Sequence, residues 1–178
     1  MELPLFADAD RTNPFLSLFY DNPTRWCFHS QMYFVCESIR QQQSILHGGK
    51  GGILDHSPYE MVEVMSAALH FEGALVEEEL TLIKQAHREM TRSLAPPDLL
   101  IHLSATPSEL IERIRLRNRA FEHSIDLGYL QAIEDFEDLF VQRWNQSPMF
   151  SIDSRIADVR DSGVANGIIA RAIEILDR

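Results

Sequence analysis

The sequence predicts an α/β fold in which a parallel sheet is flanked by helices. Short apolar runs at 3–7, 53–54, 98–103 and 149–152 alternate with segments whose apolar residues recur at helical spacing. Strands that alternate with helices favour a parallel sheet, because each crossover returns the chain to the same end. The 178 residues suffice for one core and show no repeats, so we expect a single domain over 1–178.

The first strand is expected over 3–7 and ends at Asp8. A polar turn then leads into a short helix that reaches Tyr20 and is broken at 21–23, where the sequence is Asp-Asn-Pro. Apolar residues at spacings of three and four then continue over 24–46. This periodicity predicts a long amphipathic helix.

The second strand is the apolar pair at 53–54, and a long helix is expected to follow over 57–92. Ser57 precedes a proline and has Glu60 three residues on, which is the pattern of a capping box. Gly73 is expected to bend this helix without ending it.

The C-terminal half repeats the alternation more clearly. A strand at 98–103 is followed by a second capping box at Thr106, which opens a helix. A further helix is predicted over 127–144, then a strand at 149–152 and a last helix at 163–176. These elements complete the predicted α/β order.

Composition excludes several classes of protein. The formal net charge is −11, which disfavours nonspecific binding to nucleic acid or to an anionic membrane. No apolar run is long enough to span a membrane, and we find no signal peptide. Cys27 and Cys36 fit a reducing, cytoplasmic location, and no histidine or cysteine spacing predicts a metal site.

The glycine-rich loop at 48–52 superficially resembles a phosphate-binding loop. The Walker A pattern requires Ser or Thr after the lysine, a preceding strand and a following helix. Here Gly51 follows Lys50, a helix comes before the loop, and a strand comes after it. We therefore predict a flexible connection at this point.

Two acidic residues each stand where a predicted strand ends. Asp8 follows the first strand and Asp55 follows the second. Ligands of open parallel sheets bind beyond the carboxyl ends of the strands, so the two carboxylates would face one crevice if the strands are neighbours. Such a pair could hold Mg²⁺ or accept a proton from a hydroxyl. The alternative is that each acid only caps a helix or lies in a loop.

Four arginines and a carboxylate occur within ten residues, at Arg113, Arg115, Arg117, Arg119 and Glu122. The planar guanidinium group donates two parallel hydrogen bonds to phosphate and keeps its charge. The alternative is a solvated helix face, but such faces favour mixed pairs, and Arg115, Arg117 and Arg119 have no Glu four residues earlier. The phosphate interpretation is slightly favoured.

An aromatic and amide group stands early in the chain, at Tyr20, Trp26, Phe28 and Gln31. A nucleobase can stack on aromatic rings while a carboxamide pairs with its edge. Taken alone, this group is better explained by core packing.

Together these segments resemble the deoxynucleoside kinase family, nearest to its bacterial deoxyadenosine and deoxyguanosine kinases. The matching landmarks are Asn13-Pro-Phe-Leu16, Phe19-Tyr-Asp21 with Trp26 and Gln31, Asp55-His-Ser57, Pro97-Asp-Leu-Leu-Ile-His-Leu103, Arg113 to Glu122, and Tyr129-Leu130. The resemblance implies a P-loop kinase-like fold and transfer of the γ-phosphoryl group of ATP, with Mg²⁺, to a deoxynucleoside 5′-hydroxyl. It also implies a homodimer and favours a purine deoxynucleoside.

The resemblance also assigns roles to single residues. The expected catalytic residues are Asp8 as general base, Asp55 near Mg²⁺, and the lid arginines Arg113, Arg117 and Arg119. The expected substrate-binding residues are Tyr20 and Glu122 at the sugar 3′-hydroxyl, Gln31 at the base, and Trp26 beside it. No protein ligand to a metal is assigned.

The sequence departs from the family pattern at its start. The family begins with a strand, a loop ending in Gly-Lys-Ser/Thr and a helix, and none of the three is found here. We therefore expect the chain as written not to phosphorylate. Three hypotheses remain open: an enzyme whose first segment lies upstream, a non-catalytic nucleoside-binding or scaffolding protein derived from a kinase, and a plain helical interaction module.

Three further positions differ from the family pattern. The motif's arginine is His56, an aspartate four residues after Ser57 is Met61, and an arginine seven residues after Gln31 is Ser38. In addition, the family's first strand lies in the middle of its sheet. Three explanations for the missing first strand remain open. The first segment of the protein lies upstream, the neighbouring strands close up directly, or another chain fills the gap.

Overall fold

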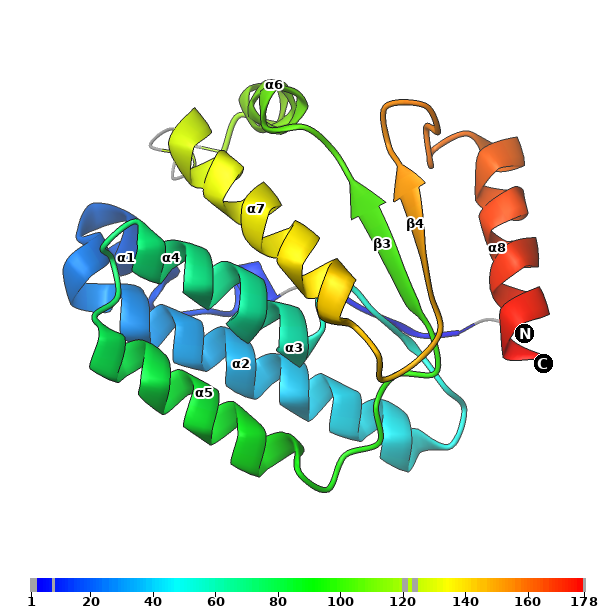
Figure 1. The fold of residues 1–178 in the computed structure, drawn as a ribbon, viewed down its shortest axis with the longest axis horizontal. Helices are drawn as coiled ribbons and strands as arrows, with labels where there is room; N and C mark the ends of the chain where they lie inside the picture. Colours follow the sequence, from blue (N-terminus) through cyan, green and yellow to red (C-terminus); the bar gives the residue numbers. More distant parts are fainter. Residues whose placement is uncertain (1–2, 8, 120–121, 123–124, 178) are drawn as a thin grey trace.

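The computed structural model describes residues 3–7, 9–119, 122 and 125–177 (Figure 1). The strands are β1 (Leu5–Phe6), β2 (Ile53–Leu54), β3 (Leu100–Ser104) and β4 (Met149–Asp153). The helical elements are η1 (Ala9–Arg11, 3₁₀), α1 (Leu16–Asp21), α2 (Pro23–Gly48), α3 (Pro58–Glu60), η2 (Met61–Ser66, π), α4 (Ala67–Phe71), α5 (Glu77–Thr91), α6 (Pro107–Arg117), α7 (Leu127–Arg143) and α8 (Ser162–Leu176). This is the α/β fold that the sequence predicts, with parallel strands between helices.

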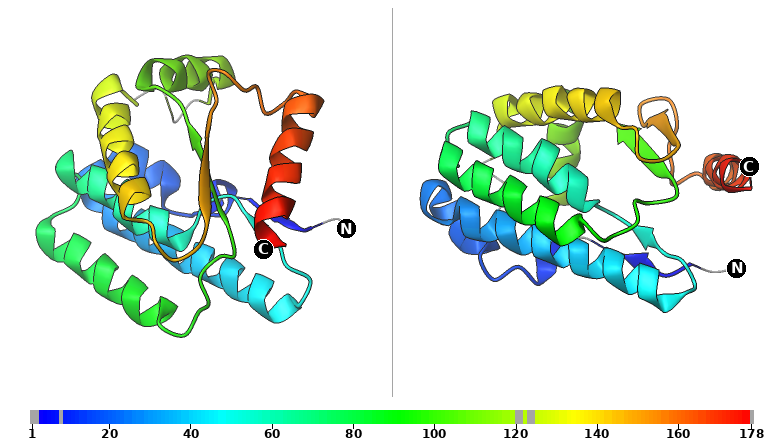
Figure 2. Two further views of the ribbon diagram at one scale, coloured as in Figure 1. Left: turned by 45° about the vertical axis from the view of Figure 1, so that its right-hand side comes forward. Right: turned by 60° about the horizontal axis from the view of Figure 1, so that its bottom comes forward.

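The strands form two separate parallel pairs (Figure 2). In the first pair β1 lies beside β2, with Leu5 opposite Ile53. In the second pair β3 lies beside β4, with Leu100 opposite Met149. Within the part of the chain that the structure describes, β2 and β3 are not hydrogen-bonded to each other. The alternative that the strands close up directly is therefore wrong for the described residues.

In each pair, both strands have a second main-chain edge without a partner strand among the described elements. In β3 the N–H of Leu100 donates to the carbonyl of Pro148 at 3.0 Å, and the carbonyl of Ser104 accepts from Ser154 at 2.9 Å. A parallel ladder uses alternate residues, so Ile101 and Leu103 turn their N–H and C=O groups away from β4. By the same rule, the N–H and C=O groups of Leu54, the second residue of β2, face away from β1.

Helices form the larger part of the core. α2, η2, α4 and α5 pack together below α7 (Figures 1 and 2). The buried apolar residues of this cluster are Cys27, Val35, Ile39, Met61, Val62, Leu69, Leu75 and Ile83. A second cluster joins Tyr59 and Val64 to Phe140 of α7, with Leu100 of β3 packed against it. α7 thereby attaches the second strand pair to the helical layer.

The long helix expected over 57–92 is broken. α4 ends at Phe71, and α5 begins only at Glu77. Gly73 has a φ of 77°, a left-handed conformation that ends a helix and that glycine adopts without strain. The expected bend at Gly73 is therefore a full interruption.

The two predicted capping boxes differ in the structure. At α6, Thr106 and Glu109 each accept a hydrogen bond from the other's main chain, at 3.4 and 2.9 Å. At α3, Ser57 accepts from the N–H of Glu60 at 3.1 Å, but the Glu60 carboxylate lies 2.9 Å from Nδ1 of His56. Only half of the expected box forms there. No helix within the described ranges is both long and apolar enough to cross a membrane.

Candidate functional site

A cavity of about 650 Å³ opens between α1, α2, η2, the end of α6 and the start of α7. Its volume lies within the range of about 300–1,000 Å³ that is typical of small-molecule sites. The lining residues are Ala7, Asp10, Leu16, Phe19, Tyr20, Ser30, Gln31, Phe34, Asp55, His56, Met61, Met65, Leu69, Arg117, Arg119, Glu122, Ile125, Tyr129, Leu130 and Ile133. Apolar walls with a few converging polar groups are suited to an organic ligand that carries hydroxyl groups.

Asn13 fixes the segment that carries the N-terminal wall of the cavity. Its side chain is buried and donates from Nδ2 to Oγ of Ser30 at 3.0 Å. Its Oδ1 accepts from the N–H of Phe15 at 3.0 Å. These bonds tie the turn between η1 and α1 to α2, which places Asp10 and Tyr20 at the cavity.

Tyr20 and Glu122 provide a donor and an acceptor at one end of the cavity. Burial, and secondarily the nearby Glu122 carboxylate, raise the pKa of Tyr20 to about 12. The phenol therefore keeps its proton at neutral pH and can donate a hydrogen bond. The side chain of Glu122 is 6% exposed. A hydroxyl group between the two residues would find both partners that it needs.

Two arginines hold Glu122 in place. Arg117 makes a two-point contact with the carboxylate, with Nε 3.0 Å from Oε2 and Nη2 2.9 Å from Oε1. Nη1 of Arg119 lies 3.4 Å from the same Oε1. A buried carboxylate requires such partners, because an unpaired charge is costly away from water.

Arg119 also makes an ion pair that crosses the cavity wall. Its Nη1 lies 2.7 Å from Oδ2 of Asp10, which is 109 residues earlier in the sequence. The only sequence signal for Asp10 is its position in the polar turn, two residues after Asp8, and a turn acid alone does not predict a distant arginine.

Gln31 is fixed from the opposite wall. Oγ of Ser66 lies 3.1 Å from Oε1 of Gln31 and 2.8 Å from the carbonyl of Met61. Ser66 ends the π-helical turn η2, and such turns often occur at functional sites. The single hydroxyl proton of Ser66 is shared between these two oxygens, so Ser66 holds the oxygen end of the carboxamide and leaves the NH₂ group as its donor.

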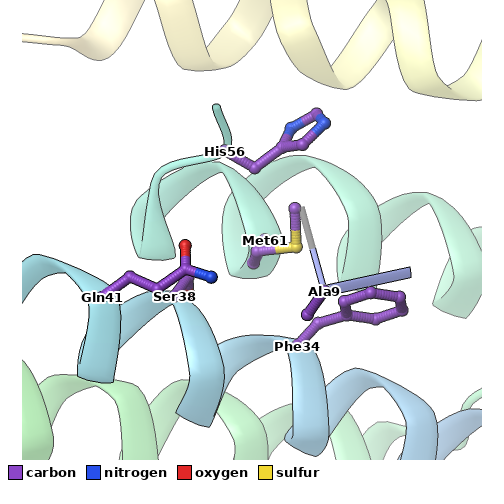
Figure 3. A pocket seen from close by; sticks show the side chains of 6 residues that line it. All are labelled: Ala9, Phe34, Ser38, Gln41, His56 and Met61. Atoms are coloured by element: carbon purple, nitrogen blue, oxygen red, sulfur yellow. The ribbon is translucent and has the colours of Figure 1, made fainter. Parts of the chain in front are cut away.

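A small hollow beside the main cavity brings together the three residues that depart from the family pattern. Figure 3 shows His56, Met61 and Ser38 around it, with Ala9, Phe34 and Gln41. Its volume of about 10 Å³ holds at most one water molecule. Ser38 of α2 thus lies beside two residues from the start of the next helical segment.

Six residues singled out in the sequence line the main cavity together: Tyr20, Gln31, Asp55, Arg117, Arg119 and Glu122. Asp55 reaches it from the end of β2, as expected from the crossover geometry. Asp8 lies outside the described residues. The structure thus assembles most of the predicted set from five separate elements.

Arg113 and Trp26 lie elsewhere. Nη2 of Arg113 donates to Oγ of Ser154 at 3.1 Å, because its position on α6 faces the loop after β4. The Trp26 ring stacks with Phe15 at 6.0 Å between ring centroids and carries Arg25 over its face at 5.1 Å. Neither side chain lines the cavity in this structure.

Two observations concern metal and phosphate binding by the described residues. Among residues 3–7, 9–119, 122 and 125–177, no three of the side chains of His, Cys, Asp and Glu are grouped to hold a metal ion. In the glycine-rich loop, a Cβ on Gly52 would lie 2.8 Å from the side chain of Ile45, and Gly51 has a φ of 72°. These glycines serve close packing and a turn, which explains the loop without a phosphate.

Comparisons with known proteins show the family of the chain. The profile of the deoxynucleoside kinase family matches residues 3–176. The chain is 31% identical over 142 residues to a deoxyadenosine kinase of Dictyostelium discoideum. The aligned region covers 80% of this chain and 58% of the relative. It is 29% identical over 163 residues to a deoxyguanosine kinase of Bacillus subtilis, covering 89% of this chain and 76% of the relative. The chain thus spans little more than half the length of the first relative.

Solved structures share the fold. A deoxyadenosine kinase of M. mycoides with dCMP and dCDP bound superposes with a TM-score of 0.79 at 19% identity, covering 97% of this chain and 87% of the other. The same enzyme with bound dCTP gives a TM-score of 0.76 at 18% identity, with 97% and 86% covered. At these identities the likeness concerns the arrangement of helices and strands.

Proposed function

Because the chain belongs to the deoxynucleoside kinase family, we propose that it binds a deoxynucleoside in the cavity of about 650 Å³. The observation that carries the proposal is the convergence of Tyr20, Glu122 and Gln31 on one cavity from α1, the segment after α6, and α2. These groups match the hydroxyl and base edges of such a ligand.

The proposed pose follows from the donors and acceptors. The sugar 3′-hydroxyl donates to the carboxylate of Glu122 and accepts from the phenol of Tyr20. The base lies toward Gln31, whose NH₂ group donates to a ring nitrogen or carbonyl. The 5′-hydroxyl then lies toward Asp55 at the end of β2 and toward the Asp10–Arg119 pair, which line the same cavity.

In the family reaction, ATP phosphorylates the 5′-hydroxyl. We propose Asp8 as the base that accepts the hydroxyl proton and Asp55 as the acid that would act near Mg²⁺. The lid arginines would stabilise the negative charge that develops on the phosphoryl group. When bound, ATP with Mg²⁺ would supply the phosphoryl group, but the 178 residues contain no loop ending in Gly-Lys-Ser/Thr to hold it. We therefore propose that these 178 residues bind the nucleoside without phosphorylating it on their own.

A second candidate function is non-catalytic nucleoside binding or scaffolding. The observation that favours it is the clustering of Ser38, His56 and Met61 around one hollow (Figure 3). Three replacements at one place are a concerted change in the environment of the ligand. The loss of a phosphate loop does not by itself require them.

We further propose a purine deoxynucleoside as ligand, a homodimer as the assembly and the cytoplasm as the location. The named relatives act on deoxyadenosine and deoxyguanosine, which supports the purine preference. The described cysteines are unpaired, which suits a reducing compartment.

Calorimetric titration tests the binding proposal. The purified chain is titrated with deoxyadenosine, deoxyguanosine, deoxycytidine and, separately, with ATP and Mg²⁺. We expect saturable binding of a deoxynucleoside, weakened about tenfold or more in Gln31→Leu, since the base loses its hydrogen-bonding partner. Gln131→Leu, on the exposed face of α7, is the matched control.

A lack of binding by every deoxynucleoside would overturn the proposal. An assay of labelled phosphate transfer from ATP separates the two candidate functions. Turnover by the 178 residues alone would refute the non-catalytic interpretation, whereas activity that appears only after an upstream segment with GxxxxGK[ST] is joined would support the kinase interpretation.

A further inference from the structure

We propose that Asp10 sets the selectivity of the cavity against 5′-phosphorylated ligands, by occupying the guanidinium group of Arg119 that a phosphate would otherwise bind. The inference rests on the proposed function, because the ligand compared is a deoxynucleoside with and without its phosphate. It concerns a residue to which the family resemblance assigns no role.

The ion pair between Asp10 and Arg119 is the first observation. Oδ2 of Asp10 lies 2.7 Å from Nη1 of Arg119, and both side chains line the cavity. The side chain of Asp10 is 23% exposed and that of Arg119 is 33% exposed, so solvent screens the pair only in part. Arginine binds carboxylate and phosphate with the same planar donors, so the two acceptors compete for one site.

The charge of the cavity is the second observation. The described lining residues carry two fixed positive charges, Arg117 and Arg119, and three acids, Asp10, Asp55 and Glu122. Each arginine already has a carboxylate partner at 3.0 Å or less. A neutral nucleoside enters such a site without charge repulsion, whereas a phosphate dianion meets an excess of negative charge.

Asp10 is better placed than Glu122 to act as the competitor. Glu122 is 6% exposed and is held by two arginines, so its release would leave a buried charge. Asp10 is more exposed and pairs with Arg119 from the short η1 element. A phosphate can therefore replace the Asp10 carboxylate at Arg119 while the contact between Arg119 and Glu122 stays intact.

The experiment measures the ratio of two dissociation constants, for deoxyadenosine 5′-monophosphate and for deoxyadenosine, at one ionic strength. Asp10→Asn keeps the shape of the side chain and removes its charge. We expect the ratio to shift at least about fivefold in favour of the monophosphate, as removal of a partly screened charge implies. Asp10→Ala should shift the ratio in the same direction. Asp98→Asn, an exposed acid away from the cavity, should leave it unchanged.

Three outcomes are informative. An unchanged ratio in both Asp10 variants, with normal deoxyadenosine binding by the wild type, would overturn the inference and leave the proposed function standing. Equal weakening of both ligands would assign Asp10 a purely structural role and also overturn it. If the wild type bound neither ligand, the proposed function would fail, and the inference with it. Thermal unfolding of each variant verifies that the fold is retained.

Discussion

The hydroxyl of Ser66 bonds to the carboxamide oxygen of Gln31 at 3.1 Å, across 35 residues of sequence. Ser66 is fully buried and ends the π-helical turn η2, and its one hydroxyl proton is shared between Gln31 and the carbonyl of Met61 at 2.8 Å. The carboxamide of Gln31 is therefore held by a residue that does not line the cavity.

Ser66→Ala should weaken base recognition. Without the hydroxyl, the carboxamide of Gln31 can rotate and offer either its oxygen or its NH₂ group, which reduces the preference among bases. We expect the affinity ratio between the preferred and a poor deoxynucleoside to fall by about threefold to tenfold, in line with loss of about one hydrogen bond. Titration calorimetry measures it.

Ser44→Ala is the matched control for Ser66. Ser44 also bonds to a main-chain carbonyl of its helix, at 2.9 Å from Arg40, but it is exposed on α2. Unchanged base selectivity in Ser66→Ala would show that Gln31 is fixed by other contacts.

Glu122→Gln should reduce the contribution of the sugar 3′-hydroxyl. In the wild type, a 2′,3′-dideoxynucleoside should bind more weakly than the deoxynucleoside by about 1.5–3 kcal/mol, because a buried carboxylate loses its hydroxyl partner. In the variant this difference should shrink to about 1 kcal/mol or less, since a neutral amide accepts a weaker bond. Competition binding with both ligands gives the difference directly.

Glu112→Gln on the exposed side of α6 removes the same charge away from the cavity and serves as control. The assignment of Glu122 to the sugar would be refuted by an equal loss of affinity for both ligands in Glu122→Gln.

Stability should depend on pH through His102 of β3. The carboxylate of Glu137, which faces Nε2 at 3.8 Å, raises the pKa of His102 above its ordinary value of 6.5, against the opposing effect of burial. Because the folded-state pKa is the higher one, protonated His102 stabilises the fold. This stabilisation is fully present below about pH 6.5 and is lost as the pH rises through the folded-state pKa.

The measurement is the free energy of unfolding in urea at intervals between pH 5.5 and 8.5. In Glu137→Gln the decrease over this range should be smaller than in the wild type. Asp135→Asn, on the exposed face of the same helix, should retain the wild-type profile. A Glu137→Gln profile identical to that of the wild type would exclude this origin of the pH dependence.

The open edge of β3 should promote association between chains. Leu103 is 51% exposed on a strand whose second main-chain edge has no partner strand among the described elements. Unpaired strand edges recruit further strands, and lysine on such an edge opposes this. Leu103→Lys should therefore lower the concentration-dependent rise in sedimentation coefficient.

Leu116→Lys introduces the same residue at a position that is 86% exposed at the end of α6. It should leave the association unchanged. If both variants lowered association equally, general surface charge and not the strand edge would be responsible.

Local sequence signals located most elements. The Thr106 capping box marks the start of α6, because its hydrogen bonds join residues three apart. The periodicity of 24–46 located α2, which spans Pro23–Gly48. The interruption at Gly73 was missed, because a single glycine is tolerated inside many helices and only the packing of the following turn decides its conformation.

The sequence by itself determined the α/β order of elements, the family and six side chains of one cavity. Each of these depends on spacing along the chain or on landmarks in a fixed order. The tertiary structure alone decided that β2 and β3 stay apart, that Ser38, His56 and Met61 surround one hollow, and that Asp10 pairs with Arg119. These are contacts between residues far apart in sequence, and their geometry is set by how helices pack, which no local pattern encodes.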